Sequence, residues 1–187
     1  EQLAYATTDL GWAYGGISDL ERERALLAEG RELWRDIGNL PMLANNLSIS
    51  WMPDYLVGEY KTALEHGREA YDISKSIGNV WGQWSGVLPR CLVTVEIGDI
   101  DEAVNATREA DDLSREGGLV IQESFGHSVR IWALSNVGAA NIIEDDYIKL
   151  RAANIDELPP AIRGWLKAIL AIFATAAGNF EEAEEYL

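Results

Sequence analysis

The sequence predicts an all-α protein built from about five antiparallel helix pairs. Three observations support this fold class. A Gly-x-apolar-x-x-Ala pattern recurs in phase with a spacing of forty residues, as GEYKTA (58–63), GDIDEA (98–103) and GNFEEA (178–183). Apolar residues between these patterns are three and four positions apart, as on one face of a helix. Only five of the 187 residues are proline, and the long stretches are rich in Ala, Leu and Glu, which favour helices.

The forty-residue spacing defines the organisation of the whole chain. The rows are 1–40, 41–80, 81–120, 121–160 and an incomplete 161–187. Their eighteenth positions hold Ser18, Gly58, Gly98, Gly138 and Gly178. Agreement in several columns over five rows predicts a single repeat array over residues 1–187.

Each row is expected to hold two helices that meet near this position. First helices are predicted for 2–17, 42–58, 80–98, 120–138 and 161–178. Second helices are predicted for 19–38, 59–78 and 99–118. Acidic residues at the start of the second helices suit the positive end of the helix dipole. The glycines in IGN and EGG, which end these segments, predict left-handed C-caps.

Two kinds of departure interrupt the pattern. Pro53 and Pro89 lie inside predicted first helices, where proline removes a hydrogen bond, so we expect a kink at each. The fourth row keeps Gly138 but loses the following apolar residue and Ala. Its second helix is expected to be short, with NIDELPP (154–160) as a loop.

Charge and composition exclude several classes of protein. The chain has 15 Lys plus Arg against 31 Asp plus Glu, a net charge of −16, which disfavours nucleic acid as a partner. The most apolar stretch, 161–178, contains Arg163 and Lys167, so we expect a buried helix and no membrane partner. The single cysteine, Cys91, excludes an internal disulfide and is expected to be a core thiol. With no signal peptide visible, we expect a cytoplasmic protein.

The two ends predict that the chain is a segment of a longer protein. It begins at EQLAYATT without Met and stops at EEAEEYL inside a helical pattern. A repeat array normally ends on a polar capping helix. We therefore expect self-association, or fraying, through the C-terminal end, where the apolar face of 161–177 would lack part of its cover.

No arrangement of residues indicates catalysis, a cofactor or a metal. The sequence has no Gly-rich phosphate loop, no HExxH and no GxSxG. His66 and His127 lie in different rows, so each is expected to be a surface histidine or one satisfied within the fold. The acidic run 144–146 is expected to be solvated. We therefore predict that the chain is not an enzyme.

The paired helices and their junction resemble tetratricopeptide (TPR) repeats. Row one carries Leu10-Gly11-x-x-Tyr14 before the turn, although Thr7 stands where the family motif has Trp. The period is longer than the family's usual length of about 34 residues. It resembles the extended arrays of large bacterial regulators, such as MalT-like and LuxR-type ATPases. The resemblance implies a right-handed superhelix, an α-solenoid. HEAT-like repeats share the forty-residue period and remain the structural alternative.

In TPR arrays the first helix of each pair lines a concave groove, and the resemblance carries this role to three columns of the present sequence. The groove residues are then Tyr5, Asn45, Phe125 and Trp165; Thr8, Ser48, Leu88 and Ser128; and Trp12, Met52, Leu92 and Trp132. Large apolar side chains edged by small polar groups are typical of binding sites. Aromatic residues at helical spacing also fill cores. Trp34, Trp51, Trp81 and Trp84 are assigned to helix packing or to the outer surface.

The sequence thus favours an interaction scaffold, part of a larger bacterial regulatory or signalling protein. It would bind a protein or peptide segment, in trans or from the same parent chain, in an apolar groove. The alternative is a sensory domain whose groove holds a small molecule. A closed aromatic pocket would favour the sensor, and a long open trough would favour the scaffold. A spacer without a ligand is the third possibility.

Overall fold

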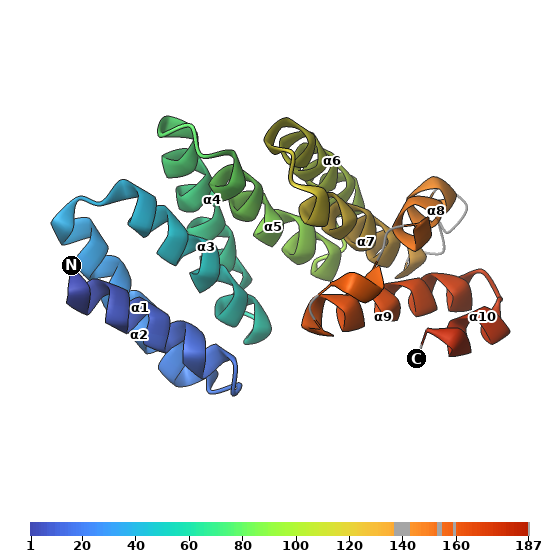
Figure 1. The fold of residues 1–187 in the computed structure, drawn as a ribbon, viewed down its shortest axis with the longest axis horizontal. Helices are drawn as coiled ribbons and strands as arrows, with labels where there is room; N and C mark the ends of the chain where they lie inside the picture. The colour runs from blue at the N-terminus through green and yellow to red at the C-terminus, as the bar shows by residue number, and fades with distance from the viewer. Residues whose placement is uncertain (137–142, 153–154, 159, 187) are drawn as a thin grey trace. The chain divides into compact units, whose positions relative to one another are not determined.

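The computed structural model describes the backbone of residues 1–136, 143–152, 155–158 and 160–186, and their side chains except those of 120–123, 125, 136 and 160–162. Regular structure in these ranges is entirely helical (Figure 1). The helices are α1 (Gln2–Gly15), α2 (Leu20–Ile37), α3 (Leu40–Leu56), α4 (Tyr60–Ser76), α5 (Val80–Glu96), α6 (Ile100–Gly117), α7 (Val120–Asn136), α8 (Glu144–Ala152), η2 (Ile155–Glu157), α9 (Pro160–Ala176) and α10 (Phe180–Glu185). The predicted all-α fold of adjacent helix pairs is confirmed.

The chain divides into two compact units, and each has its own core. Unit 1 is Glu1–Val93 and unit 2 is Thr94–Leu187. In unit 1, α1 packs on α2, α2 on α3, and α3 on α4. In unit 2, α6 packs on α7, which also contacts α8 and α9, while α10 packs on α9.

Trp34 is the largest fully buried side chain of unit 1. It is 0% exposed and packs with Leu43, Leu47 and Ala70. Its indole N–H donates to Thr8 Oγ1 at 3.0 Å, so the polar atom of the ring is satisfied inside the core. Burying each such apolar side chain contributes about 1.5–3 kcal/mol.

The core of unit 2 joins α7, α8 and α9. Its buried members are Ile131, Leu134, Ile143, Tyr147, Leu150, Ile155, Leu166, Ile169, Leu170 and Phe173. Tyr147 stacks on Phe173 with ring centroids 4.1 Å apart. The Tyr147 hydroxyl donates to Glu182 Oε1 at 2.6 Å, which ties α10 to this core. Most of the apolar face of α9 is therefore covered, whereas Trp165 and Ile172 remain 37% and 36% exposed.

From residue 18 to residue 118 a residue with left-handed backbone conformation returns every twenty residues, just after the ends of helices α1 to α6, and another follows α9. The glycines with positive φ are Gly38 (74°), Gly58 (82°), Gly78 (69°), Gly98 (80°), Gly118 (63°) and Gly178 (81°). The predicted C-cap glycines are thereby confirmed. In the first row the same position is taken by Ser18, with φ of 60°. Asp19, Asn39, Asn79 and Asp99 follow these turns, and their side chains accept the backbone N–H three residues later.

Replacing Ser18 with Gly is expected to stabilise the chain. An L-residue in the left-handed region costs roughly 1–2 kcal/mol, and glycine returns about 0.4–1 kcal/mol of this through the entropy of the unfolded chain. We expect a net gain of about 0.5–1 kcal/mol, measured by urea denaturation followed by circular dichroism. Gly58→Ser is the matched control, because Gly58 lies forty residues later with no atom within 4 Å of its added Cβ. It should lose a similar amount; equal effects of the two changes would contradict this account.

The fourth row departs from the others as predicted. Its second helix, α8, has 9 residues, whereas α2, α4 and α6 have 17 or 18. The predicted loop 154–160 contains the short 3-10 helix η2. Gly138 lies outside the described residues.

Both internal prolines lie within continuous helices. Pro53 is inside α3 and Pro89 is inside α5. A Cβ at Gly67 of α4 would lie 2.4 Å from Pro89 Cγ, so the proline ring occupies the space that this glycine leaves. The kinks stay predictions. Within the described residues, no helix is long and apolar enough to cross a bilayer.

Candidate functional site

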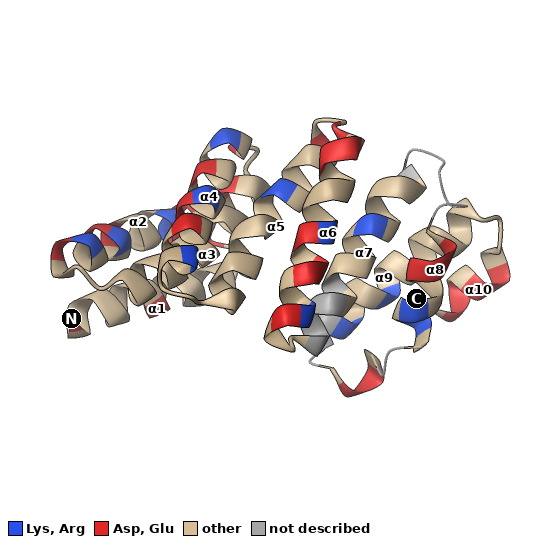
Figure 2. Cartoon of the chain, turned by 90° about the horizontal axis from the view of Figure 1, so that it is seen from above, with Lys and Arg blue, Asp and Glu red and all other residues tan. Residues whose placement is uncertain are grey.

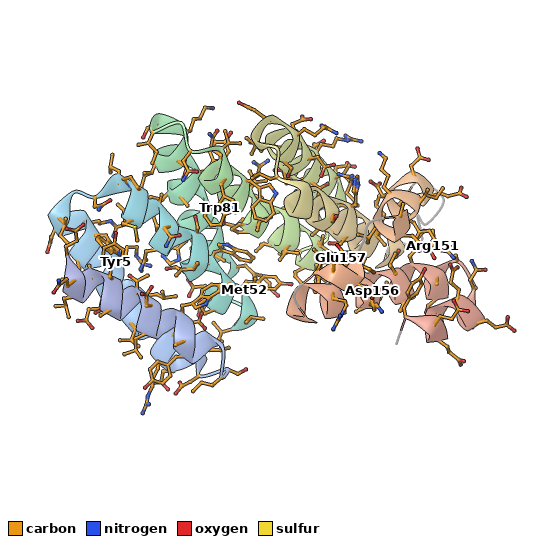
Figure 3. The ribbon with its side chains drawn as sticks, viewed as in Figure 1. Tyr5, Met52, Trp81, Arg151, Asp156 and Glu157 are labelled. Atoms are coloured by element: carbon orange, nitrogen blue, oxygen red, sulfur yellow. The ribbon has the colours of Figure 1, made fainter. Side chains whose placement is uncertain are left out.

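Large apolar side chains are exposed on the first helices of unit 1. Trp12 of α1 is 62% exposed, Tyr5 of α1 is 40% and Met52 of α3 is 39%. Trp81, near the start of α5, is 39% exposed, and Figure 3 shows it together with Tyr5 and Met52 from one side. We call Tyr5, Trp12 and Met52 the apolar strip. All three belong to the columns expected to line a groove.

The expected polar edge of that groove lies inside the helix packing. Thr8 is 2% exposed, and Ser48 is 5% exposed. Thr8 Oγ1 accepts hydrogen bonds from Trp34 Nε1 at 3.0 Å and from Asn46 Nδ2 at 3.2 Å. Ser48 Oγ donates to the Ala44 carbonyl within its own helix at 2.8 Å. These hydroxyls satisfy buried polar groups of the fold.

The groove residues expected on α5 are not exposed. Leu88 and Leu92 are 7% and 4% exposed, so both are buried. Asn45 of α3 is half-buried. The strip therefore uses the Trp12 position in the first two rows and the Tyr5 position only in the first row.

In unit 2, three of the expected groove residues come together. Trp165 of α9 donates its indole N–H to Ser128 Oγ of α7 at 3.2 Å. The rings of Trp165 and Trp132 meet edge to face, with centroids 6.3 Å apart. Ser128 is 0% exposed and Trp132 is half-buried, so Trp165 is the exposed member. The side chain of Phe125 lies outside the described residues.

Three cavities lie where a second helix meets the first helix of the next repeat. One, between α2, α3 and α4, has a volume of about 320 Å³; one between α4 and α5 has about 370 Å³; and one between α6, α7 and α8 has about 430 Å³. Their linings match at intervals of forty residues: Ala28, Arg68 and Arg108; Arg31, Tyr71 and Asp111; Ser50, Arg90 and Arg130. The groove columns did not include these positions. The spacing of Arg90 and Arg130, and of Arg68 and Arg108, is the sequence signal that would have found them.

The cavity in unit 2 contains a buried ionic cluster. Arg130 of α7 donates to Asp111 of α6 and to Asp146 of α8. The Nδ1 atom of His127 lies 2.7 Å from Asp146 Oδ1. His127 is therefore satisfied within the fold, which was one of the two alternatives expected for it. The expectation that the acidic run 144–146 is solvated is wrong for Asp146, whose side chain is 15% exposed, because α8 places it against these two residues.

The pKa values of the two carboxylates in this cluster are shifted in opposite directions. Burial opposes the ionisation of Asp146, but hydrogen bonds from His127 and Arg130 outweigh it and hold its pKa at about 2. Burial raises the pKa of Asp111 above its ordinary value despite the attraction of Arg130. One oxygen of Asp111, Oδ1, is buried without a hydrogen-bond donor among the described residues.

Acid is expected to destabilise unit 2 through Asp146. Its pKa in the folded protein, about 2, is lower than the usual value near 3.9, so the ionised form stabilises the fold above about pH 4. This stabilisation is lost as the pH falls through 2, at a cost of order 2 kcal/mol. Asp146→Asn should remove this part of the acid sensitivity, measured as urea midpoints at pH 4.5 and about pH 2. Asp112→Asn, a change at an exposed carboxylate, is the control; an unchanged acid slope in Asp146→Asn would contradict the assignment.

Unit 1 has a smaller cluster around a buried acid. Asp54 Oδ1 accepts from Arg24 Nε at 2.7 Å, and His66 Nδ1 lies 2.9 Å from Asp54 Oδ2. Burial alone would raise the pKa of Asp54, but His66 and Arg24 lower it overall. Arg31 of the same cavity donates to Ser50 Oγ at 3.1 Å. His66 thus lies against Asp54, but its buried Nδ1 atom makes no hydrogen bond of acceptable geometry among the described residues.

Among the described residues, no group of three or more His, Cys, Asp or Glu side chains is arranged to hold a metal ion. Cys91 is buried at 1% exposure, as expected of a core thiol. The chemically distinctive features are thus the apolar strip, the Trp132–Trp165 pair and the cavities between repeats.

Comparison with known proteins shows the fold and little else. No protein-family model and no curated protein matches the sequence. The structure is similar to a crystal structure of a kinesin light chain-like protein of Podosopora anserina with nearly identical TPR-like repeats, at a TM-score of 0.67 and 14% identity over 97% of this chain and 90% of that one. A point variant of that protein gives a TM-score of 0.69 and 14% identity over 100% and 92% of the two chains. The fold is therefore a TPR-like α-solenoid.

Proposed function

We propose that this chain is an interaction module that binds a segment of a partner protein on the first helices of unit 1. The observation that carries the proposal is the apolar strip. Trp12, 62% exposed, is a large aromatic side chain held on a regular helix, which is the commonest kind of anchor in protein interfaces. TPR-like repeats suit this role, because adjacent helices present a rigid surface that an extended or helical segment can follow.

The form of the strip favours a protein segment over a small molecule. None of the five cavities described for this chain is lined by Tyr5, Trp12 or Met52. A drug-sized ligand is usually enclosed over most of its surface, whereas a peptide can lie along an open surface. A small-molecule sensor using the same residues therefore remains the second candidate.

A capture experiment tests the proposal directly. The chain and its Trp12→Ser variant would be immobilised, exposed to lysate of the source organism, and compared by mass spectrometry of the bound proteins and small molecules. We expect a partner protein whose recovery falls at least about tenfold with Trp12→Ser, since an aromatic anchor commonly contributes about 2 kcal/mol or more.

The matched control is Leu10→Ser on the same helix. Leu10 is 48% exposed and lies two residues from Trp12, about 200° around the helix. It should leave the recovery of the partner unchanged. Equal losses in the two variants would mean that general surface hydrophobicity drives capture, and a metabolite lost with Trp12→Ser would favour the sensor.

The wider setting follows from the sequence resemblance and is part of the proposal. We place the module in a larger bacterial regulatory or signalling protein, in the cytoplasm and without catalytic activity of its own. Self-association through the C-terminal end is also proposed, because Phe180 of α10 is 66% exposed. Sedimentation equilibrium would test it: a dimer that Phe180→Ser dissociates supports this contact, and a monomer at all concentrations excludes it.

A further inference from the structure

The cavities between repeats collect most of the chain's positive charge. They are lined by two, three and four Lys or Arg side chains in turn, nine of the 15 in the sequence. These nine are Arg24 and Arg31; Lys61, Arg68 and Arg90; and Arg108, Arg115, Arg130 and Lys149. The chain as a whole has a net charge of −16, and Figure 2 shows acidic residues along α6 and α10. The α4–α5 cavity has the largest excess of positive charge, with three Lys or Arg side chains against one acid, Glu65, whereas the cavity in unit 2 is lined by four of each.

In the cavities beside α3 and α7, carboxylates of the chain itself pair with arginines of the lining. Asp54 accepts from Arg24 in the cavity beside α3. Asp111 and Asp146 accept from Arg130 in the cavity beside α7. The arginines there serve the fold, because their partners are buried acids.

The cavity between α4 and α5 differs at the matching positions. Forty residues after Asp54 stands Thr94, and forty residues before Asp111 stands Tyr71. Arg68 is exposed and forms no ion pair within the part of the chain that the structure describes. Lys61 is 90% exposed and lies 3.8 Å from Glu65, itself 53% exposed, a pair too open to hold either charge firmly.

This cavity is also lined by apolar side chains. Its lining includes Leu64 and Tyr71 of α4 and Val87 of α5, which is 1% exposed. The two helices touch through their backbones, because a Cβ at Gly86 would lie 2.7 Å from the Gly67 carbonyl oxygen. The Pro89 ring and the two backbones fill the space at this crossing, so the cavity lies beside it, next to Leu64 and Tyr71 of α4.

We propose that the α4–α5 cavity binds an acidic peptide segment of a partner protein, with one carboxylate against Arg68 and Lys61 and a neighbouring apolar side chain on Leu64, Tyr71 and Val87. The volume of about 370 Å³ suits one or two side chains of a peptide. The guanidinium of Arg68 can bind a carboxylate through two parallel hydrogen bonds. Because the rest of the surface repels acidic ligands, binding is confined to the positively charged cavity.

This site is separate from the proposed apolar strip, and it requires a charged group in its ligand where the strip does not. The strip needs only a bulky apolar segment, whereas the α4–α5 cavity needs a carboxylate. A partner could use both sites, but each is tested by its own variant.

The test uses three capped peptides and amide chemical-shift mapping by NMR on the whole chain. The probe is acetyl-Ser-Asp-Phe-Ser-Gly-amide; the second peptide has Asn in place of Asp, and the third has Lys. We expect the Asp peptide to shift amides of 61–71 and 86–90, with binding at least about tenfold tighter than that of the Asn peptide, because a hydrogen bond to a charged group is lost. Free 3-phenylpropionate, a small acid of the same chemistry, should bind more weakly than the Asp peptide.

Variants then assign the contact. Lys61→Gln combined with Arg68→Gln should weaken the Asp peptide about tenfold or more, and Arg68→Lys should restore part of the loss. Trp12→Ser should leave this peptide's binding unchanged. Circular dichroism and the unshifted amides of other helices show that each variant is folded, since Lys61 and Arg68 are both exposed.

Each other outcome overturns the proposal. Equal binding of the Asp and Asn peptides, stronger binding of the Lys peptide, shifts confined to other helices, or no shift at millimolar peptide would exclude an acidic segment at this cavity. Binding of 3-phenylpropionate as tight as that of the peptide would exclude a peptide as the specific occupant and assign the cavity to a small carboxylate.

Discussion

Replacing Arg130 with Met is expected to destabilise unit 2 by about 3–5 kcal/mol, the usual cost of removing one partner from a buried ion pair. Arg130 donates to Asp111 and to Asp146, and no other donor to Asp111 is found among the described residues. Asp111 is 5% exposed. Without the guanidinium, its charge has neither water nor a donor, so it must take up a proton or the helices must separate.

The loss caused by Arg130→Met should depend on pH in a defined direction. Burial already raises the pKa of Asp111, and removing Arg130 raises it further. A carboxyl group with a raised folded pKa stabilises the fold when protonated, and this stability is lost as the pH rises through that pKa. The difference between Arg130→Met and the unsubstituted chain should therefore shrink as the pH falls from 8 toward 5.

Hydrogen exchange of unit 2 amides measures this loss without contributions from unit 1. Arg115→Met is the control, since Arg115 pairs with Asp112 where both side chains are more than half exposed, and it should cost under about 0.5 kcal/mol. Asp111→Leu added to Arg130→Met should recover part of the loss, which a double-mutant cycle quantifies. A loss below about 1 kcal/mol in Arg130→Met would mean that water reaches Asp111.

Replacing Trp34 with Ala is expected to cost about 3–5 kcal/mol in unit 1, because it removes a fully buried aromatic side chain and leaves a cavity. Trp34 is 0% exposed, lies edge to face with Tyr5 at 4.7 Å between centroids, and donates to Thr8. The change also removes a hydrogen-bond donor from the buried hydroxyl of Thr8. Urea denaturation followed by circular dichroism measures the loss.

Two further variants separate the contributions at Trp34. Trp34→Phe keeps most of the apolar volume but loses the indole N–H, and should cost about 1–2 kcal/mol. Trp12→Ala, at a position 62% exposed, should stay within about 0.5 kcal/mol of the unsubstituted chain. A large loss in Trp12→Ala would contradict its assignment to the surface and would also undermine the capture experiment.

The helix pairs could be predicted from the sequence because the evidence for them is local. Glycine is strongly favoured in the left-handed conformation, and its return at Gly38, Gly78 and Gly118 identified the ends of the helices. The short α8 followed from the loss of the junction pattern in the fourth row. Periodicity and caps of this kind depend on neighbouring residues and not on the packing of distant ones.

The candidate sites were harder to predict because exposure depends on packing between helices. Thr8 and Trp12 are four residues apart on one helix, yet Thr8 is 2% exposed and Trp12 is 62%. The spacing of residues along the sequence shows which of them share one side of a helix, but not whether the next helix covers that side. The same limit applied to Asp146, whose partners His127 and Arg130 lie on another helix.

The open turns that end the helices have a consequence for how such a chain can be altered. A Cβ added at Gly38, Gly58, Gly78, Gly98, Gly118 or Gly178 would have no atom within 4 Å. Residues inserted at these turns would extend into solvent and would displace no packed side chain. An epitope, a fluorescent reporter or a protease site could thus be introduced at these turns, which recur along the array.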